Sequence, residues 1–205
     1  FHATRASGAQ PTLVAGTPNG QQVLAFNGAS QALTINGLAT DLSGTAIAAH
    51  WFMVARLTAA VPSGGWVVPV SLGQSDVTPR IGFYASTSQH FNFVAGNAYT
   101  SVANTPVTNQ WYLVEGTFDP ASGAVTTYVN QTLAGTVVNQ PAAVGNNALS
   151  VGRIGCAWNA AAESRYFGGQ IAELAVVKGR IVSGSERSAI LQGLNAAYGL
   201  GLSIV

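Results

Sequence analysis

Charged residues are scarce in this chain of 205 residues: Asp, Glu, Lys and Arg make up 7% of it, against roughly 25% in an average soluble domain. The formal net charge is +1, Lys178 is the one lysine, and no run of basic residues occurs. Affinity for nucleic acids rests mainly on clustered lysines and arginines. We therefore expect no nucleic-acid partner, and we expect neutral Ser, Thr, Asn, Gln and Gly residues to solvate the surface.

Cysteine and long apolar runs are also nearly missing. Cys156 is the only cysteine, which excludes an internal disulfide and a zinc site built from several thiolates. Hydrophobic residues make up 48% of the chain, yet no stretch approaches the ~18 apolar residues that a spanning helix requires. We expect no membrane span. The chain begins at Phe1 without a signal-peptide pattern, which we interpret as a processed chain or a piece of a longer one.

Short β-type runs separated by turn residues dominate the chain from Val23 onward, for example QVLAF before NGAS and WYLVEGTF before DPASG. More than eight such runs indicate an antiparallel sandwich or jelly roll. A parallel sheet would need helical crossovers, and no helical period occurs before the C-terminus. We predict an all-β, two-sheet antiparallel jelly-roll sandwich over residues 23–205, preceded by an N-terminal arm or linker over residues 1–22.

The segment SGSERSAILQGLNAAYG predicts one C-terminal α-helix at about residues 184–198. Ser183 and Glu186 have the spacing of a capping box, and Gly199 stands where a left-handed residue would end the helix. The apolar stripe consists of Ile190, Leu191, Leu194 and Ala197. We expect this stripe to cover an open edge or end of the sandwich.

Two segments, WYLVEGTFDPASGAVTTYVNQ and YFGGQIAELAVVKGRIVSGSERSAILQGL, resemble motifs of the laminin G-like, concanavalin A-like jelly rolls. With FNGASQALTI and TAIAAHWFMVARL, the resemblance covers roughly residues 23–200. It implies a hairpin turn at Asp119 and Gly123, and a second turn at Asn130, where Gln131 stands in place of the family's usual glycine. The same sandwich carries lectins, hydrolases, lyases and structural modules, so the resemblance implies the fold more than the function.

Strand alternation predicts a first candidate site. In TAIAAHWFMVARL, alternate residues such as Trp51 point to the core, which leaves the others on an outer, concave face. The residues that share this face are His50, Phe52, Arg56, Glu115 and Tyr128. Polar groups beside aromatic rings can bind a sugar. The alternative is that Arg56 and Glu115 form an ion pair on an exposed sheet.

The irregular segment GCAWNAAAESRYFGG predicts a second candidate site on a rim loop. Its candidate ligand-binding residues are Trp158, Asn159, Arg165 and Tyr166, with Glu163 between them. Loops carried by a rigid scaffold commonly bind ligands. The alternative is that Trp158 packs over one end of the core. Trp66 and His90 carry weaker versions of this argument, and Trp111, which opens a strand of the resemblance, is expected in the core.

No catalytic constellation is visible. Retaining glycosidases use two carboxylates ~5 Å apart, and of the seven acidic residues only Glu115 and Asp119 lie close together on a strand. Neither a G-x-S-x-G nor an H-E-x-x-H motif occurs. We expect no enzyme activity, no catalytic residue and no cofactor. A calcium site, which needs several converging oxygens, stays open as an alternative through the loop aspartates Asp41 and Asp76.

These observations favour a non-enzymatic module that binds a surface glycan, located outside a cell or on the surface of a virion. The resemblance and the low-charge, lysine-poor composition suit a phage tail fibre, spike or capsid-decorating protein, and a secreted bacterial adhesin would share them. We expect a cell-surface glycan or neighbouring virion proteins as partners, within a homo-oligomeric assembly. The alternatives are a purely structural virion protein that acts through protein contacts, and a polysaccharide hydrolase or lyase.

Overall fold

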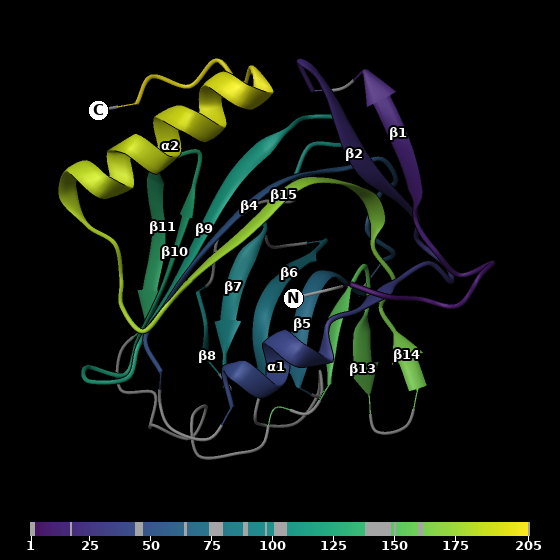
Figure 1. The fold of residues 1–205 in the computed structure, drawn as a ribbon, viewed down its shortest axis with the longest axis horizontal. Coiled ribbons are helices and arrows are strands. Elements are labelled where there is room, and N and C mark those ends of the chain that lie inside the picture. The colour runs from purple at the N-terminus through teal and green to yellow at the C-terminus, as the bar shows by residue number, and fades with distance from the viewer. Residues whose placement is uncertain are drawn as a thin grey trace.

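Two large antiparallel sheets face each other in the computed structural model, and a long helix lies outside them (Figure 1). This arrangement confirms the predicted jelly-roll sandwich. The structure describes residues 3–16, 18–43, 47–63, 65–73, 80–87, 90–96, 98–100, 106–137, 149, 151–159 and 162–204.

The first sheet has seven strands in the described part of the chain. Their order is β1 (Thr12–Gly16), β2 (Gly20–Asn27), β15 (Gly168–Lys178), β4 (Ala49–Leu57), β9 (Tyr112–Asp119), β10 (Ala124–Val129) and β11 (Thr132–Val137). Strand β15 brings a late segment into the middle of this sheet, between β2 and β4. Strands from the beginning and from the end of the chain thus pair within one sheet.

The second sheet has six strands in the order β3 (Leu33–Thr34), β12 (Gly152–Ile154), β5 (Trp66–Gly73), β6 (Arg80–Ser86), β7 (Asn92–Ala95) and β8 (Ala98–Tyr99). A separate hairpin of β13 (Ala157–Asn159) and β14 (Ala162–Ser164) follows β12 directly. The short helix α1 (Asn36–Asp41) contributes the buried Ala39 to the core. Its six residues are too few for the hydrophobic period by which a helix is recognised in a sequence.

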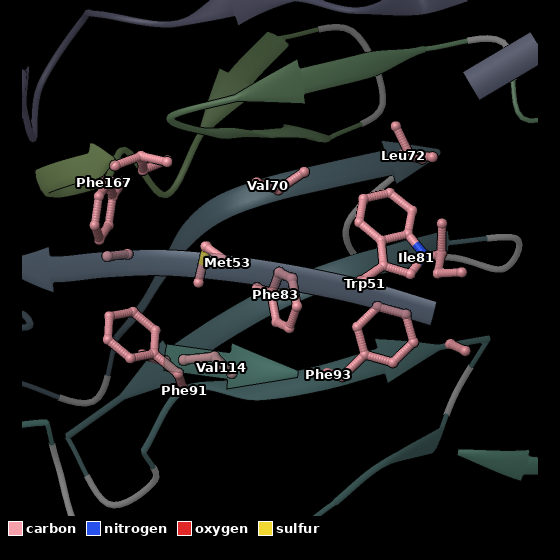
Figure 2. Close-up of a cluster of buried hydrophobic side chains, with 14 of the residues drawn as sticks. Trp51, Met53, Val70, Leu72, Ile81, Phe83, Phe91, Phe93, Val114 and Phe167 are labelled. Carbon is pink, nitrogen blue, oxygen red and sulfur yellow. The ribbon is translucent and has the colours of Figure 1, made fainter. Parts of the chain in front are cut away.

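The core lies between the sheets and is built from aromatic and branched side chains (Figure 2). Trp51 is fully buried, and its ring centroid lies 6.3 Å from that of Phe83 and 5.9 Å from that of Phe93. Val114 and Phe118 of β9 also point into this core. The alternation of faces that the sequence predicts along β4 and β9 is therefore confirmed.

The segment expected as an N-terminal arm forms part of the sandwich. Strand β1 pairs with β2 along the edge of the seven-stranded sheet, and Thr4 exchanges two backbone hydrogen bonds with Thr34 at 3.1 and 2.8 Å. The boundary expected at residue 22 is thus too late. The run TLVA has β-forming residues, but it is short and is flanked by Gly and Pro, so we did not predict a strand there. As an edge strand, β1 pairs with β2 alone.

Helix α2 (Gly184–Tyr198) has the predicted bounds, and Gly199 ends it with a φ of 58°. The predicted capping box does not form, because Ser183 makes no side-chain cap and Glu186 pairs with Arg180 instead. Neither α1 nor α2 combines the length and the apolar character that crossing a membrane would require.

Helix α2 covers the outer face of the seven-stranded sheet (Figure 1). The expectation that it would cover an edge or end of the sandwich is therefore wrong. Leu191 of α2 packs there with Phe52, Val54 and Leu113 in a second hydrophobic cluster. Strands β4 and β9 are consequently buried on both faces. Such strands read as nearly continuous hydrophobic runs, and the run WFMVA in β4 has this character.

Candidate functional site

The first predicted cluster assembles, but it lies beneath α2. The His50 ring stacks on Phe52 with centroids 4.3 Å apart, and His50 Nε2 lies 3.4 Å from Oε2 of Glu115. All three residues are at most 1% exposed. A ligand cannot reach them, so the expectation of an open sugar-binding groove on this face is corrected.

Arg187 of α2 contacts Glu115 and Tyr128, two of the residues that were expected to bind a sugar. Its Nε and Nη2 donate to the two carboxylate oxygens of Glu115 at 2.7 and 2.8 Å, and its guanidinium lies 4.5 Å from the ring centroid of Tyr128. Arg56 lies elsewhere, 4.9 Å from the ring centroid of Trp111. The alternative ion pair between Arg56 and Glu115 does not form.

The second predicted segment forms a partly exposed cluster at the hairpin of β13 and β14. We call it the guanidinium cluster, and it consists of Arg5, Arg153, Trp158, Glu163 and Tyr166. Three segments far apart in the sequence supply these side chains: the stretch before β1, strand β12, and the hairpin with the residues after it. Cross-strand pairing places Trp158 directly opposite Glu163.

The carboxylate of Glu163 is the centre of this cluster. It accepts two hydrogen bonds from the Arg5 guanidinium, of which the Nη2–Oε2 bond is 2.6 Å long, one from Nε of Arg153 at 3.0 Å and one from the Tyr166 hydroxyl at 3.1 Å. Burial by itself raises the pKa of Glu163, but these hydrogen bonds outweigh burial and lower it. Burial, with the bond to Glu163, raises the pKa of Tyr166. The carboxyl group is therefore ionised at neutral pH.

Arg153 joins the carboxylate to an aromatic ring. Its guanidinium carbon lies 4.8 Å from the ring centroid of Trp158, within the range of a cation–π contact. Its Nη1 donates to Oδ1 of Asn36, the first residue of α1, at 3.2 Å and to the Gly152 carbonyl at 2.9 Å. Its Nη2 donates to none of the residues that the structure describes. The Arg153 side chain is 10% exposed, and these contacts fix it in place.

The other two predicted residues of this segment lie beside the cluster. Asn159 ends β13 and Arg165 follows β14, and both are partly exposed. Arg165 has a φ of 53°, and its carbonyl accepts a hydrogen bond from Val68 of β5. Within the guanidinium cluster itself, two guanidinium groups, those of Arg5 and Arg153, surround the single carboxylate of Glu163.

The hairpin sits on the outer face of the six-stranded sheet. Ala157 packs there against a small hydrophobic cluster with Val68, Tyr84 and Val94, and Trp66 lies at its border. Trp66 is therefore a packing residue, its ring centroid 6.4 Å from that of Tyr84.

His90 is also a packing residue. Its ring centroid lies 4.4 Å from that of Tyr112, and its Nδ1 accepts a hydrogen bond from the Phe91 amide at 2.9 Å. Trp111, expected in the core, lies at the rim of the seven-stranded sheet and is partly exposed.

Sequence reasoning missed Arg5 and Arg153. Arg5 stands 158 positions from Glu163, and no local signal links two residues at that separation. Arg153 belongs to the predicted run ALSVGRI, but its face could not be assigned without knowing where the hairpin packs.

Among the residues that the structure describes, no three His, Cys, Asp or Glu side chains are grouped so that they could hold a metal ion. Asp41 pairs with Lys178, with Oδ1 2.7 Å from Nζ. Asp76, the other aspartate of the calcium alternative, lies outside the described residues. Calcium thus stays an open alternative at Asp76.

Comparisons with known proteins agree on the fold. The model of the concanavalin A-like lectin/glucanases superfamily matches residues 19–185. The CBM40 module of the Ruminococcus gnavus IT-sialidase, bound to α2,3-sialyllactose, has a TM-score of 0.67 at 12% identity, covering 82% of this chain and 95% of that one. No curated protein matches the chain.

Two further solved structures are similar. Domain 4 of AbnA, a GH43 extracellular arabinanase from Geobacillus stearothermophilus in complex with arabinotriose, has a TM-score of 0.60 at 14% identity, covering 88% of this chain and 82% of that one. The NanB sialidase of Streptococcus pneumoniae has a TM-score of 0.62 at 14% identity, over 80% of this chain and 26% of that one. At these identities the likeness shows a shared fold.

Proposed function

This chain belongs to the concanavalin A-like lectin/glucanases superfamily, and on that premise we propose that it is a non-catalytic module that binds an acidic glycan. The observation that carries the proposal is the guanidinium cluster, in which arginines outnumber the carboxylate beside a partly exposed tryptophan.

The chemistry of the cluster suits a sugar that carries a carboxylate. A guanidinium group donates strong, charge-assisted hydrogen bonds to carboxylate oxygens. Arg153 is held by Glu163 and Asn36, yet its Nη2 donates to no described residue. Trp158 adds a ring that can cover the apolar face of a sugar. The site therefore combines a charged anchor with an aromatic platform.

The sugars bound in two of the similar solved structures support this assignment. The CBM40 module is bound to α2,3-sialyllactose, whose sialic acid carries a carboxylate, and the AbnA domain is in complex with arabinotriose. Sugar binding on this fold thus covers acidic and neutral glycans. In the guanidinium cluster two arginines surround one carboxylate, which favours the acidic class.

The placement of the acidic residues supports a module without catalysis. A retaining glycosidase needs two carboxyl groups about 5 Å apart, one of them with a raised pKa. In the guanidinium cluster Glu163 has four donors around it and a lowered pKa. The other described acids are engaged elsewhere: Asp41, Glu115, Asp119, Glu173 and Glu186.

Isothermal titration with 3′-sialyllactose tests the proposal. We expect a dissociation constant of ~0.1–1 mM, typical of a shallow polar site. Trp158→Ala and Arg5→Gln should each weaken binding about tenfold or more, equivalent to about 1.4 kcal/mol. The matched control is Arg180→Gln, because Arg180 pairs with Glu186 at α2 and is more than half exposed. Equal affinity of all variants would refute the assignment of the site.

We further propose that the module is displayed in several copies outside a cell or on a virion. A weak single site gains about 10²–10⁴ in overall affinity when copies are linked, and a low-charge surface rich in neutral polar residues suits such an assembly.

Contact with neighbouring proteins is a second candidate function, favoured by the exposed edge strands. Leu13 of β1 and Leu133 of β11 are 58% and 56% exposed at the two edges of the seven-stranded sheet, and a sheet edge can pair with another chain. If these edges form contacts, Leu13→Lys and Leu133→Lys should lower the mass measured by analytical ultracentrifugation. A monomer at all concentrations would rule this candidate out for copies of the chain.

A further inference from the structure

A hollow of about 360 Å³ lies between the C-terminal end of α2 and the rim of the seven-stranded sheet, away from the guanidinium cluster. We call it the α2 hollow. Three separate regions line it: the turn between β1 and β2, the residues before β9 with the turn after β10, and the end of α2 with the tail that follows. Its volume is in the range of small-molecule sites, roughly 300–1,000 Å³.

Hydrogen bonds hold the walls of the α2 hollow in place. Asn195 exchanges two of them with the backbone of Leu202, at 2.8 and 2.9 Å, and Gln131 donates to the Ser203 carbonyl at 3.2 Å. The Tyr198 hydroxyl donates to Glu173 at 2.9 Å. The tail is thus fixed against the sheet, so a ligand would meet a preformed site and lose less affinity to ordering it.

The lining of the hollow is aromatic and amide-rich, and it carries no charged side chain. Trp111 and Tyr198 supply the rings, while Asn19, Gln110 and Asn130 supply the amides; the remaining lining residues are leucine, proline and glycine. Arg56 lies over the Trp111 ring but does not line the hollow, and its Nε donates to Gln170. A lining without charge favours a neutral ligand over a phosphate or a carboxylate. The amides make it a poor site for a purely apolar ligand.

The amides leave hydrogen-bonding groups available. Oδ1 of Asn130 accepts from the Leu113 amide at 3.0 Å, but its Nδ2 donates to no residue that the structure describes. Nδ2 of Asn19 donates to the Ala196 and Ala197 carbonyls at 3.2 Å, which leaves its Oδ1 to accept. The exposed Gln110 amide offers both kinds of group. Hydroxyl groups both donate and accept, so they complement this set.

We propose that the α2 hollow is a second carbohydrate site that takes a neutral sugar unit, with its hydroxyls on the amides and its apolar face on the rings. The site goes beyond the acidic-glycan function and does not depend on it, because it shares no residue with the guanidinium cluster. A module with both sites would bind a neutral and an acidic sugar on opposite sheets.

Indole signals in ¹⁵N-resolved NMR spectra test this inference, because the chain has four tryptophans. The probes are lactose, cellobiose and arabinotriose, each at about 20 mM, which would saturate a site of millimolar affinity. We expect at least one of them to shift the Trp111 signal, assigned by its loss in Trp111→Phe. The signals of the buried Trp51 and of Trp158 should stay in place.

Two variants decide whether the shift reports the α2 hollow. Gln110→Ala should weaken the effect at least threefold, while the matched control Gln192→Ala, at an exposed glutamine of α2 outside the hollow, should leave it unchanged. The inference is overturned if no probe moves the Trp111 signal, if Gln110→Ala has no effect, or if dilution alone moves the signal, which would indicate contact between copies. A shift of Trp158 by sialyllactose, lost in Arg5→Gln, reports the acidic site independently.

Discussion

Arg187 of α2 donates two hydrogen bonds to Glu115 of β9, and this pair joins the helix to the outer face of the seven-stranded sheet. The carboxylate is completely buried, whereas the arginine side chain is 25% exposed. His50 and Phe52 lie beside it under the same helix. Helix α2 makes these polar residues of β4 and β9 inaccessible to a ligand. Arg187 neutralises the charge of Glu115 within the interface between the helix and the sheet.

Removing Arg187 should destabilise the fold more than a surface arginine would. Arg187→Met leaves the Glu115 carboxylate buried without its cation, a change that costs about 3 kcal/mol in comparable pairs. Urea unfolding of the variant and of Arg180→Met, whose arginine is exposed, measures the difference. Adding Glu115→Gln to Arg187→Met should recover part of the loss, and a loss below about 0.5 kcal/mol in the single variant would contradict the buried-pair account.

Trp51→Ala should lower the free energy of unfolding by about 3–5 kcal/mol, the usual cost of emptying a large core position. Trp51 is fully buried and packs against Phe83 and Phe93. Chemical denaturation followed by circular dichroism gives the value. A change within 1 kcal/mol would be incompatible with the packing shown in Figure 2.

Gln131→Gly should stabilise the protein. Asn130 and Gln131 form the two-residue turn between β10 and β11 with φ values of 49° and 71°, the conformation for which Asn-Gly is preferred. Relieving glutamine of a left-handed conformation gains ~1 kcal/mol, of which the lost bond to Ser203 offsets part. We expect a net gain of about 0.5 kcal/mol. A lower melting temperature would show that the bond to the tail matters more.

Stability should fall with acid in a window set by His90. Burial lowers the pKa of His90 from 6.5 to about 4, so the unfolded chain binds the proton more readily between these values. The contribution of His90 is fully present above pH 6.5 and is lost as the pH falls toward 4. Melting temperatures at pH 7, 5.5 and 4.5 should decline for the wild type and less for His90→Gln. Parallel declines would assign the acid sensitivity to other groups.

The sequence predicted the faces of the strands correctly but could not predict which face was open. Alternation placed His50, Glu115 and Tyr128 together, and the structure does so. Whether that face meets solvent depends on where α2 docks, a long-range contact that a local period does not encode. The continuous apolar run of β4 was the available signal that both of its faces are covered.

The guanidinium cluster, too, could be predicted only in part from the sequence. A tryptophan, a carboxylate and a tyrosine in one irregular segment led us to predict a rim site, and the structure brings Trp158, Glu163 and Tyr166 together. The arginines that give the site its charge come from β12 and from the stretch before β1. Only the folded chain brings Arg5 and Arg153 to Glu163, so the sequence alone could not suggest the acidic sugar that we propose.

The central claim is that the guanidinium cluster binds an acidic glycan. The most direct measurement follows the Trp158 indole signal in ¹⁵N-resolved NMR spectra while 3′-sialyllactose and, separately, lactose are added to the wild-type protein. The two sugars differ by the sialic acid unit, so the comparison isolates the charged group. We predict a saturable shift of the Trp158 signal with sialyllactose at ~0.1–1 mM and none with lactose. A Trp158 signal that stays in place with sialyllactose, or that moves equally with both sugars, would contradict the account.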